Sequence, residues 1–224
     1  MQEAAIGFIV ISQTPRPKLT NELMQVCAPV RQIVQIGTLD GLSPAEIAAL
    51  SPKDDKDTLF TTLPDGSDIK VSKQETYRLV HRCLDKLHER SVSAALLCCS
   101  SRFPDFESKV RLLQPSRVLS GLVQAVLPKG RLGLLLPLPE QIESITGKWR
   151  RDDIEVVGEA VAPGSSPENI TAAASALAQR MPDLILMDCM AYTAAERTLV
   201  RSVYSGPILT AMSASGRVLD ELAS

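Results

Sequence analysis

Short apolar runs recur along the chain and are separated by polar stretches that contain proline and glycine. Such a run, bounded by turn residues, is typical of a strand buried on both faces of a parallel sheet. The pattern predicts strands over residues 5–12, 31–36, 92–98, 132–136, 154–157, 184–187 and 207–210.

Helices are predicted between these strands, because residues that cap helix N-termini precede several amphipathic segments. Ser43, Ser72 and Thr193 are each followed three residues later by glutamate, which is the capping-box pattern. Strands that alternate with helices indicate an α/β fold. The predicted helices cover residues 20–26, 73–90, 107–113, 117–127, 167–180 and 213–222, with others after Ser43, near Trp149 and after Thr193.

One segment departs from this alternation. Residues 58–63 and 68–72 are β-prone and flank Pro64-Asp65-Gly66-Ser67, and Asp-Gly at the centre of a turn is a hairpin signal. The second half of the chain has no counterpart. We therefore expect a β-hairpin insertion at about residues 57–73, as a lid or a subunit contact.

Cys189 lies where a predicted strand ends and a loop leads into a helix. Ligands of open α/β sheets bind at this carboxyl edge. The amides at the N-terminus of the next helix also favour the thiolate form of a nearby cysteine. Cys189 is thus a candidate reactive cysteine, and the alternative is an ordinary buried core cysteine.

The same pattern occurs a second time. Residues 94–99 align without a gap with residues 184–189, which places Cys99 on Cys189. A duplicated unit of strand, cysteine, loop and helix would bring two thiols to facing edges of two sheets. The alternative is that two unrelated apolar strands end in cysteine by coincidence.

The repeat divides the 224 residues into two lobes. We expect a first α/β lobe over residues 1–115 and a second over 116–206. A C-terminal strand and helix, residues 207–224, should pack back on the first lobe. Apolar residues make up 45% of the chain, enough for a sizeable core.

Composition argues against several classes of function. The formal net charge is −2, so no basic field favours nucleic acid. No apolar run approaches the roughly 18 residues of a membrane span, and the N-terminus lacks a secretory signal. Five cysteines without CxxC spacing indicate reduced thiols. We expect a cytoplasmic protein with no nucleic-acid or membrane partner. The sequence is compatible with a homodimer.

Cofactor and metal motifs are absent: the chain has no G-x-G-x-x-G after a strand, no P-loop and no H-E-x-x-H. The only two histidines, His81 and His88, fall two turns apart on a predicted helix, about 10 Å, too far to share one ion. We therefore expect no cofactor and no metal. Cysteine is then the residue best suited to chemistry.

The loop after the first strand, Ser12-Gln13-Thr14-Pro15-Arg16, carries hydroxyls and a guanidinium. Because arginine offers a planar fork of donors, Arg16 is a candidate counter-ion for a carboxylate. Arg102 and Arg217 are further candidates. The alternative for this loop is a solvated turn.

A set of short motifs resembles the AroM family, within the aspartate/glutamate racemase superfamily. The set extends over nearly the whole chain, and it is more specific than any one member. The motifs are Ile6-Gly7-Phe8-Ile9, Gln13-Thr14-Pro15-Arg16, Leu39-Asp40-Gly41-Leu42-Ser43, residues 97–104, Pro115-Ser116-Arg117, Lys148-Trp149 and residues 187–192.

The resemblance implies two pseudo-symmetric, flavodoxin-like domains with parallel sheets and a substrate cleft between them. In the racemases of the superfamily, one cysteine removes a proton from the substrate α-carbon and a second delivers one, without metal or organic cofactor. Cys99 and Cys189 would be these catalytic residues. A small carboxylate would be held by Gln13, Thr14, Arg16, Ser100, Ser101, Arg102, Tyr192 and Thr193.

Three positions differ from the superfamily pattern. Ser100-Ser101 follow the first cysteine where Asn-Thr is common, and Tyr192 lies near the place of a histidine in glutamate racemases. Asp188 precedes the second cysteine where glycine is common. An acidic neighbour would raise the pKa of the Cys189 thiol if its side chain pointed at the site.

Several functions are compatible with these residues. The first is a cofactor-independent racemase or epimerase of a small carboxylate that uses both cysteines. The second is a lyase or decarboxylase that uses one thiol as proton donor. The third is a non-catalytic protein that binds or senses a small carboxylate, and a fourth is thiol redox chemistry at Cys98-Cys99.

Overall fold

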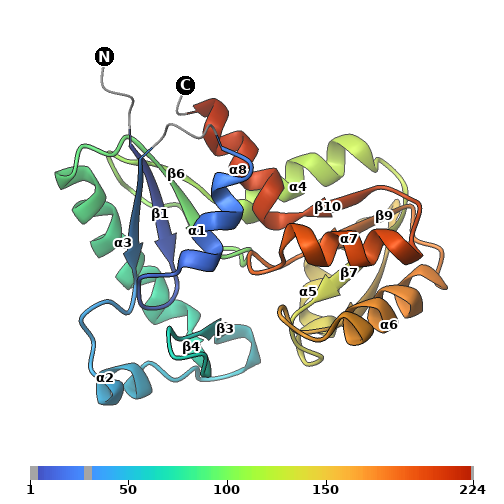
Figure 1. Ribbon diagram of the computed structural model, residues 1–224, viewed down its shortest axis with the longest axis horizontal. Coiled ribbons are helices and arrows are strands. Elements are labelled where there is room, and N and C mark those ends of the chain that lie inside the picture. The colour runs from blue at the N-terminus through green and yellow to red at the C-terminus, as the bar shows by residue number, and fades with distance from the viewer. Residues whose placement is uncertain (1–4, 28–31, 223–224) are drawn as a thin grey trace. The chain divides into compact units, whose positions relative to one another are not determined.

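The structure, a computed structural model, describes residues 5–27 and 32–222. The chain forms two compact units (Figure 1). The first unit consists of two chain segments, one that ends at Ser116 and one that begins at Ser215. The second unit spans Arg117–Ala214. Each unit is built around its own parallel sheet, as the sequence predicts.

The first unit has a four-stranded sheet in the order β2-β1-β5-β6, and all its pairings are parallel. Helices α1 (Pro17–Met24) and α3 (Lys73–Glu89) flank β1 on opposite sides (Figure 1). Because helices cover both faces of the sheet, its strands have continuous apolar sequences. The other elements are β1 (Ile6–Val10), β2 (Ile33–Gly37), α2 (Pro44–Ala49), a 3-10 turn (Asp55–Asp57), β3 (Thr58–Thr62), β4 (Asp68–Ser72), β5 (Ala94–Cys98) and β6 (Arg111–Leu113).

The predicted hairpin insertion is confirmed. Strands β3 and β4 pair antiparallel, with Thr62 opposite Asp68. In the turn, the Asp65 carboxylate accepts a hydrogen bond from the Ser67 amide at 2.9 Å, and Gly66 has a φ of 89°. A residue with a side chain rarely adopts this left-handed conformation, so glycine is required at this position.

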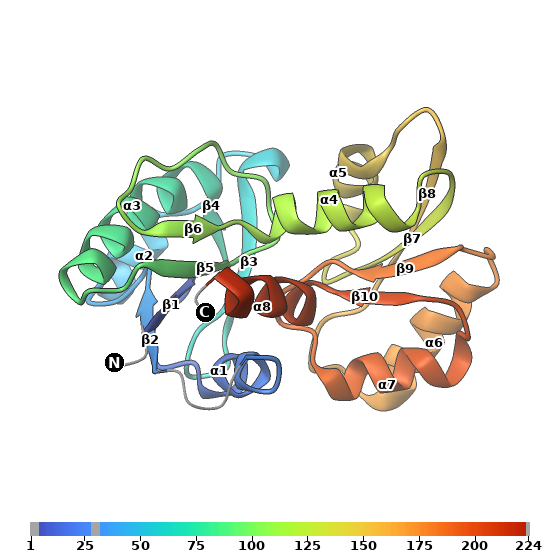
Figure 2. The same ribbon diagram turned by 90° about the horizontal axis from the view of Figure 1, so that it is seen from above.

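The second unit has a four-stranded sheet in the order β10-β9-β7-β8, again with parallel pairing throughout. Helices α6 and α7 pack together on one side of it and α5 lies on the other (Figure 2). The elements are α4 (Pro115–Val126), β7 (Gly130–Leu136), α5 (Gln141–Trp149), β8 (Ile154–Ala160), α6 (Pro167–Ala178), β9 (Leu184–Met187), α7 (Ala194–Val203), β10 (Ile208–Thr210) and α8 (Ala211–Leu222).

Strand pairing shows that the two sheets have the same connectivity and the same register. In the first sheet Ile6 lies opposite Ala94, and in the second Leu132 lies opposite Leu184. The gap-free alignment of residues 94–99 with 184–189 is therefore a structural equivalence. It makes β1, β2, β5 and β6 the counterparts of β7, β8, β9 and β10.

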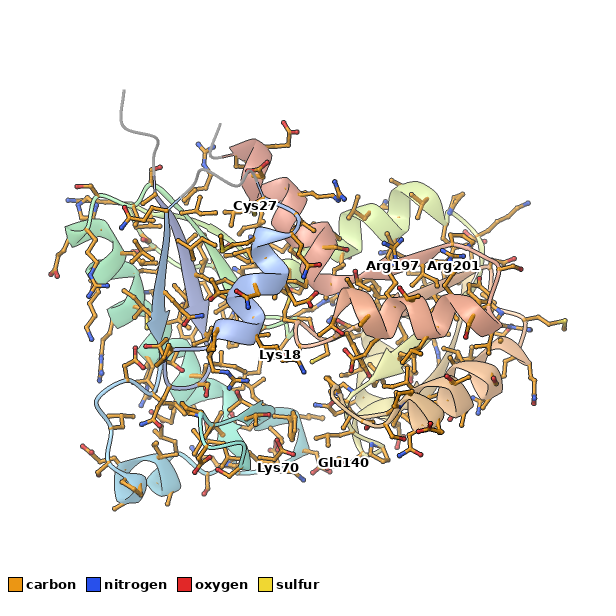
Figure 3. The ribbon with its side chains drawn as sticks, viewed as in Figure 1. Lys18, Cys27, Lys70, Glu140, Arg197 and Arg201 are labelled. Atoms are coloured by element: carbon orange, nitrogen blue, oxygen red, sulfur yellow. The ribbon has the colours of Figure 1, made fainter. Side chains whose placement is uncertain are left out.

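The last helix of each repeat belongs to the other unit. Helix α4 follows β6 of the first sheet, but its residues from Arg117 belong to the second unit. Helix α8 follows β10 of the second sheet, and its residues from Ser215 complete the first unit. There, the Cys27 thiol donates to the Gly216 carbonyl oxygen over 3.5 Å (Figure 3).

One predicted element is wrong. Residues 107–113 were expected to form a helix, but residues 102–108 lie in a long loop and Arg111–Leu113 form the edge strand β6. The Arg111 amide donates to the Ser93 carbonyl at 2.8 Å, which starts the parallel pairing with β5. Pairing with an existing sheet edge thus overrides the local helical pattern.

The structure also bears on the predicted second strand and on membrane spans. The expected second strand begins at Arg31, which lies outside the described residues, and β2 begins at Ile33. Within residues 5–27 and 32–222, no helix is both long enough and apolar enough to cross a bilayer.

Candidate active site

Each sheet has one position where the chain reverses its direction of winding. In the first sheet the chain passes from β1 to β2 on one side and later returns to β5 on the other side. In the second sheet it does the same with β7, β8 and β9. Ligands of open α/β sheets bind beyond the carboxyl ends of the strands at this switch point.

Cys99 lies at the switch point of the first sheet, directly after β5. Its amide donates to the Leu97 carbonyl at 2.8 Å, which turns the chain sharply away from the strand. Its side chain belongs to the buried cluster that includes α3, and the residue is 8% exposed. The predicted ligand contacts that follow are Ser100 and Ser101, which are half-buried, and Arg102, which is exposed.

Aromatic side chains anchor the loop that carries Cys99. Phe103 is buried in the same cluster, 6% exposed, and Lys73 Nζ lies 5.7 Å from its ring centroid. The Tyr77 hydroxyl donates to the Asp105 carbonyl at 2.8 Å. Contacts with Lys73 and Tyr77 therefore tie the loop after Cys99 to α3.

The loop after β1 reaches the same switch point. Asp40 fixes it: the carboxylate accepts from the Thr14 amide at 2.7 Å, from the Thr14 hydroxyl at 2.8 Å and from the Gly37 amide at 2.7 Å. The Gln13 side-chain amide donates to the Leu42 carbonyl at 3.3 Å. Asp40 was not predicted as a site residue, although its position in the Leu39–Ser43 motif offered a signal.

Arg16 is also held in place. Its Nη1 donates to the Ser12 hydroxyl oxygen at 3.2 Å and to the Thr62 carbonyl of β3. The Ser12 hydroxyl donates to the same carbonyl at 2.8 Å. The hairpin thus bonds to the loop after β1, and Arg16 has a structural function that the sequence did not reveal.

Cys189 occupies the equivalent switch point of the second sheet. Strand β9 ends at Met187, and Cys189 is half-buried against the cluster that includes α6 and α7. Residues 95, 97 and 99 pack toward α3, and residues 185, 187 and 189 pack toward α6, the counterpart of α3. Each cysteine therefore lies on the equivalent face of its unit.

Thr193 and Glu196 fix the loop after Cys189. They form the predicted capping box of α7: the Thr193 amide and hydroxyl donate to the Glu196 carboxylate at 2.6 and 2.8 Å. The Glu196 carboxylate also accepts from the Gly164 amide at 2.6 Å. Glu196 is 6% exposed, so this carboxylate joins two loops at the edge of the sheet from a buried position.

Tyr192 is a core residue. It is 1% exposed, and its hydroxyl donates to the Val161 carbonyl at 2.6 Å. Burial raises the pKa of the Tyr192 hydroxyl well above its ordinary value, and electrostatic interactions with Cys189, Glu196 and Asp188 raise it further.

The sequence model of the AroM protein family matches residues 6–223. The chain belongs to the AroM family. A comparison with curated proteins found no match.

Three solved structures show which fold the AroM chain has. An arylmalonate decarboxylase is 12% identical with a TM-score of 0.66, covering 98% of this chain and 92% of its own. The maleate isomerase Iso from Pseudomonas putida S16 is 16% identical with a TM-score of 0.64, covering 98% and 92%. The aspartate racemase of Picrophilus torridus is 15% identical with a TM-score of 0.57, covering 98% and 94%. The chain thus shares its fold with these three structures, and the predicted fold class is confirmed.

The candidate residues of the AroM chain fall into two groups, one in each unit. Tyr192 and Thr193 already use their hydroxyls in internal hydrogen bonds, as Thr14 does. The first unit contains Gln13, Thr14, Arg16, Cys99, Ser100, Ser101 and Arg102, and the second contains Cys189, Tyr192 and Thr193.

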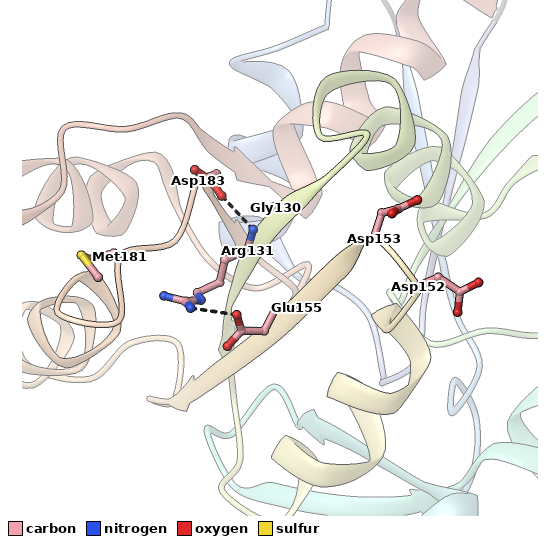
Figure 4. A pocket seen from close by; sticks show the side chains of 7 residues that line it. All are labelled: Gly130, Arg131, Asp152, Asp153, Glu155, Met181 and Asp183. Carbon is pink, nitrogen blue, oxygen red and sulfur yellow. Dashed lines mark hydrogen bonds and ion pairs between the residues drawn. The ribbon is translucent and has the colours of Figure 1, made fainter.

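Two pockets of the AroM chain lie elsewhere. One, at the amino end of β7 and β8, has Arg131 among acidic residues; its amide donates to Asp183 at 2.8 Å and its guanidinium pairs with Glu155 at 2.8 Å (Figure 4). The other lies along α8 and contains Arg217, Val26 and Glu221. Neither pocket is lined by a candidate cysteine.

Proposed function

We propose that this chain is a cofactor-independent enzyme of the racemase or epimerase type, acting at the α-carbon of a small carboxylate. Cys99 and Cys189 are the two acid–base groups of the proposal. The observation that carries it is the shared register, since both cysteines follow the same strand position at the switch point of their sheets.

The reaction needs one thiolate and one thiol. The thiolate removes the α-proton, and the thiol on the other side of the carbon delivers a proton to the resulting carbanion. A free cysteine titrates near about 8.5, so loop amides and the N-termini of nearby helices must favour the thiolate. Donors from Ser100 and Ser101 would stabilise the negative charge that develops on the substrate carboxylate.

Arg16 suits the role of carboxylate partner in this proposal. The bonds to Ser12 and Thr62 both use Nη1, and a guanidinium carries five N–H donors. A side chain held by two internal contacts also loses less conformational freedom when a ligand binds. Arg102 is exposed and provides a second cation close in sequence to Cys99.

The experiment begins with a thermal-shift screen of small mono- and dicarboxylates. A ligand that stabilises the protein is then incubated with it in D₂O, and deuterium at the α-carbon is measured by NMR. We expect exchange in the unsubstituted protein and no net turnover in Cys99→Ser or Cys189→Ser. Cys27→Ser is the matched control and should retain activity. Full turnover in both test variants would refute the two-thiol mechanism.

A decarboxylase is the second candidate, and the unequal burial of the two cysteines favours it. Cys99 is 8% exposed, whereas Cys189 is more accessible. A decarboxylase needs one thiol, which protonates the enolate left after carbon dioxide departs. Release of carbon dioxide with Cys189 essential and Cys99 dispensable would favour this function. Ligand stabilisation without any chemical change would instead favour a binding or regulatory protein.

A further inference from the structure

A buried charge pair lies directly before Cys189. Asp188 is 3% exposed, and its Oδ2 accepts a hydrogen bond from Trp149 Nε1 at 2.9 Å. The same oxygen lies 3.5 Å from Lys148 Nζ, and the exposed fractions of the two charged side chains are 13% for lysine and 1% for aspartate. Two consecutive residues in the last turn of α5 therefore converge on one carboxylate oxygen.

Such an arrangement is costly unless it is completely partnered. A buried carboxylate loses its hydration, and an ion pair with hydrogen bonds must replace it. Trp149 is 1% exposed, so its indole N–H can donate only within the protein. The Lys148 ammonium also lies 5.1 Å from the centroid of the Trp149 ring. The three side chains thus form one unit, the Lys148–Asp188–Trp149 cluster.

The cluster lies on the opposite side of the strand end from the cysteine. Met187 packs with the cluster of α6 and α7, and Cys189 lies against it, whereas Asp188 contacts α5. The Asp188 amide donates to the Leu135 carbonyl at 3.0 Å. The backbone immediately before Cys189 is therefore fixed by the sheet and by α5. The counterpart of Asp188 in the first unit is Cys98, which carries no such charge.

We propose that the Lys148–Asp188–Trp149 cluster positions Cys189 and balances the charge beside it. Asp188 anchors the end of β9, and the Lys148 ammonium cancels a negative charge that would otherwise oppose the Cys189 thiolate. The titratable groups next to Cys189 in the chain and on the elements beside this strand end are Asp188, Tyr192, Glu196 on α7 and Lys148 on α5. The role in catalysis rests on the proposed function, but the effect on the thiol does not.

The test measures the thiol directly and uses no substrate. Native protein is treated with iodoacetamide, and the alkylation rate of Cys189 is followed by peptide mass spectrometry, with the other cysteines as internal references. We expect Lys148→Met to slow the reaction of Cys189 about tenfold near neutral pH, equivalent to one pKa unit. Asp188→Asn keeps an acceptor for Trp149 and should accelerate it. Lys148→Arg should preserve the rate.

The opposite signs separate charge balance from a merely structural role. The double variant Lys148→Met/Asp188→Asn has no charge in the cluster and should react near the original rate, and it replaces Lys148→Met if that variant does not fold. The exposed Lys129→Met is the control and should change nothing. Equal rates in all variants, or slowing in both single variants, would overturn the proposal. The expected alkylation rates together with no turnover in the unsubstituted protein would contradict the proposed function and leave the effect on the thiol standing.

Discussion

At the scale of single residues, several side chains predicted to bind a ligand already have internal partners. Tyr192 illustrates this, because its hydroxyl is buried and bonded to a backbone carbonyl. A sequence shows that a tyrosine follows a candidate cysteine, but the direction of its side chain depends on packing against other elements. Its neighbour Cys189, by contrast, lies at the sheet edge where the strand pattern places it.

The substitution Tyr192→Phe tests this assignment. It leaves the buried Val161 carbonyl without its donor, so we expect the free energy of unfolding to fall by about 1–3 kcal/mol. Urea unfolding followed by circular dichroism measures this loss. Alkylation of Cys189 and any turnover should persist in the folded variant. A large loss of turnover at unchanged stability would instead make Tyr192 a ligand-binding residue.

Cys83 gives a prediction for pH. It is 3% exposed, its thiol donates to the Gly37 carbonyl over 3.7 Å, and burial raises the pKa of the thiol from 9.0 to about 12. The folded state therefore keeps a proton that the unfolded chain loses above pH 9.0. This contribution to stability is complete below pH 9.0 and is lost progressively as the pH rises toward 12.

The variant Cys83→Ser isolates this contribution, since serine does not titrate in this range. We expect the variant to be less stable than the unsubstituted protein near neutral pH. The difference should narrow by up to about 1 kcal/mol per pH unit above the thiol's ordinary pKa. Urea unfolding of both proteins over a pH series measures it. A stability difference between the two proteins that is the same at all pH values would contradict a raised pKa of the Cys83 thiol.

At the scale of elements, the sequence predicted the strands and most helices because their apolar periodicity and capping residues are local signals. It failed at residues 107–113, where a short helix was predicted and the edge strand β6 forms instead. Leu112 and Leu113 pair instead with Ala95 and Leu96. Strand pairing is a long-range contact, so no local pattern reports it. The capping box predicted the local contact of Glu196 with Thr193, but the bond of Glu196 to Gly164 and those of Asp40 to Thr14 join distant parts of the chain and were not predicted.

Two glycines make the packing of elements testable. A Cβ on Gly7 in β1 would lie 2.7 Å from Leu87 Cδ1 of α3 and 2.8 Å from the Ala95 Cβ of β5. We expect Gly7→Ala to cost about 1–3 kcal/mol. Gly147 in α5 has no atom within 4 Å of that position, so Gly147→Ala should stabilise by about 0.5–1 kcal/mol. Thermal unfolding of the two variants measures both changes in stability. Equal changes in the two variants would contradict the packing described.

At the scale of the whole molecule, each unit contains a helix that follows the sheet of the other unit in the chain. These helices are α4 in the second unit and α8 in the first. Leu219 of α8 is completely buried, and a side chain on Gly216 would lie 2.5 Å from Val26 Cγ2. The sequence predicted that the C-terminal strand and helix, residues 207–224, both pack on the first lobe. The helix belongs to the first unit from Ser215, but the strand β10 pairs with β9 in the sheet of the second unit. The helix α4 was likewise expected in the second lobe, because the predicted bounds of that lobe, residues 116–206, contain the helix predicted over residues 117–127.

Truncation after Ala214 tests this dependence. The variant lacks the part of α8 that belongs to the first unit, so we expect amide hydrogen exchange to accelerate in α1 and in the rest of that unit. Protection of β7, β8 and β9 should be largely retained. Mass spectrometry of peptides from both units measures the contrast. Unchanged protection of α1 would show that α8 contributes little to the first unit.

The crossed helices also constrain the order in which the protein can be made. Domains generally fold as units from the N-terminus during synthesis. The first unit cannot do so here, because its closing helix follows the entire second unit in the chain. On the ribosome, the sheet that contains β1 and β5 therefore lacks helix α8 while the second unit is made. The side of α1 that packs against α8 stays uncovered until translation has passed Leu219.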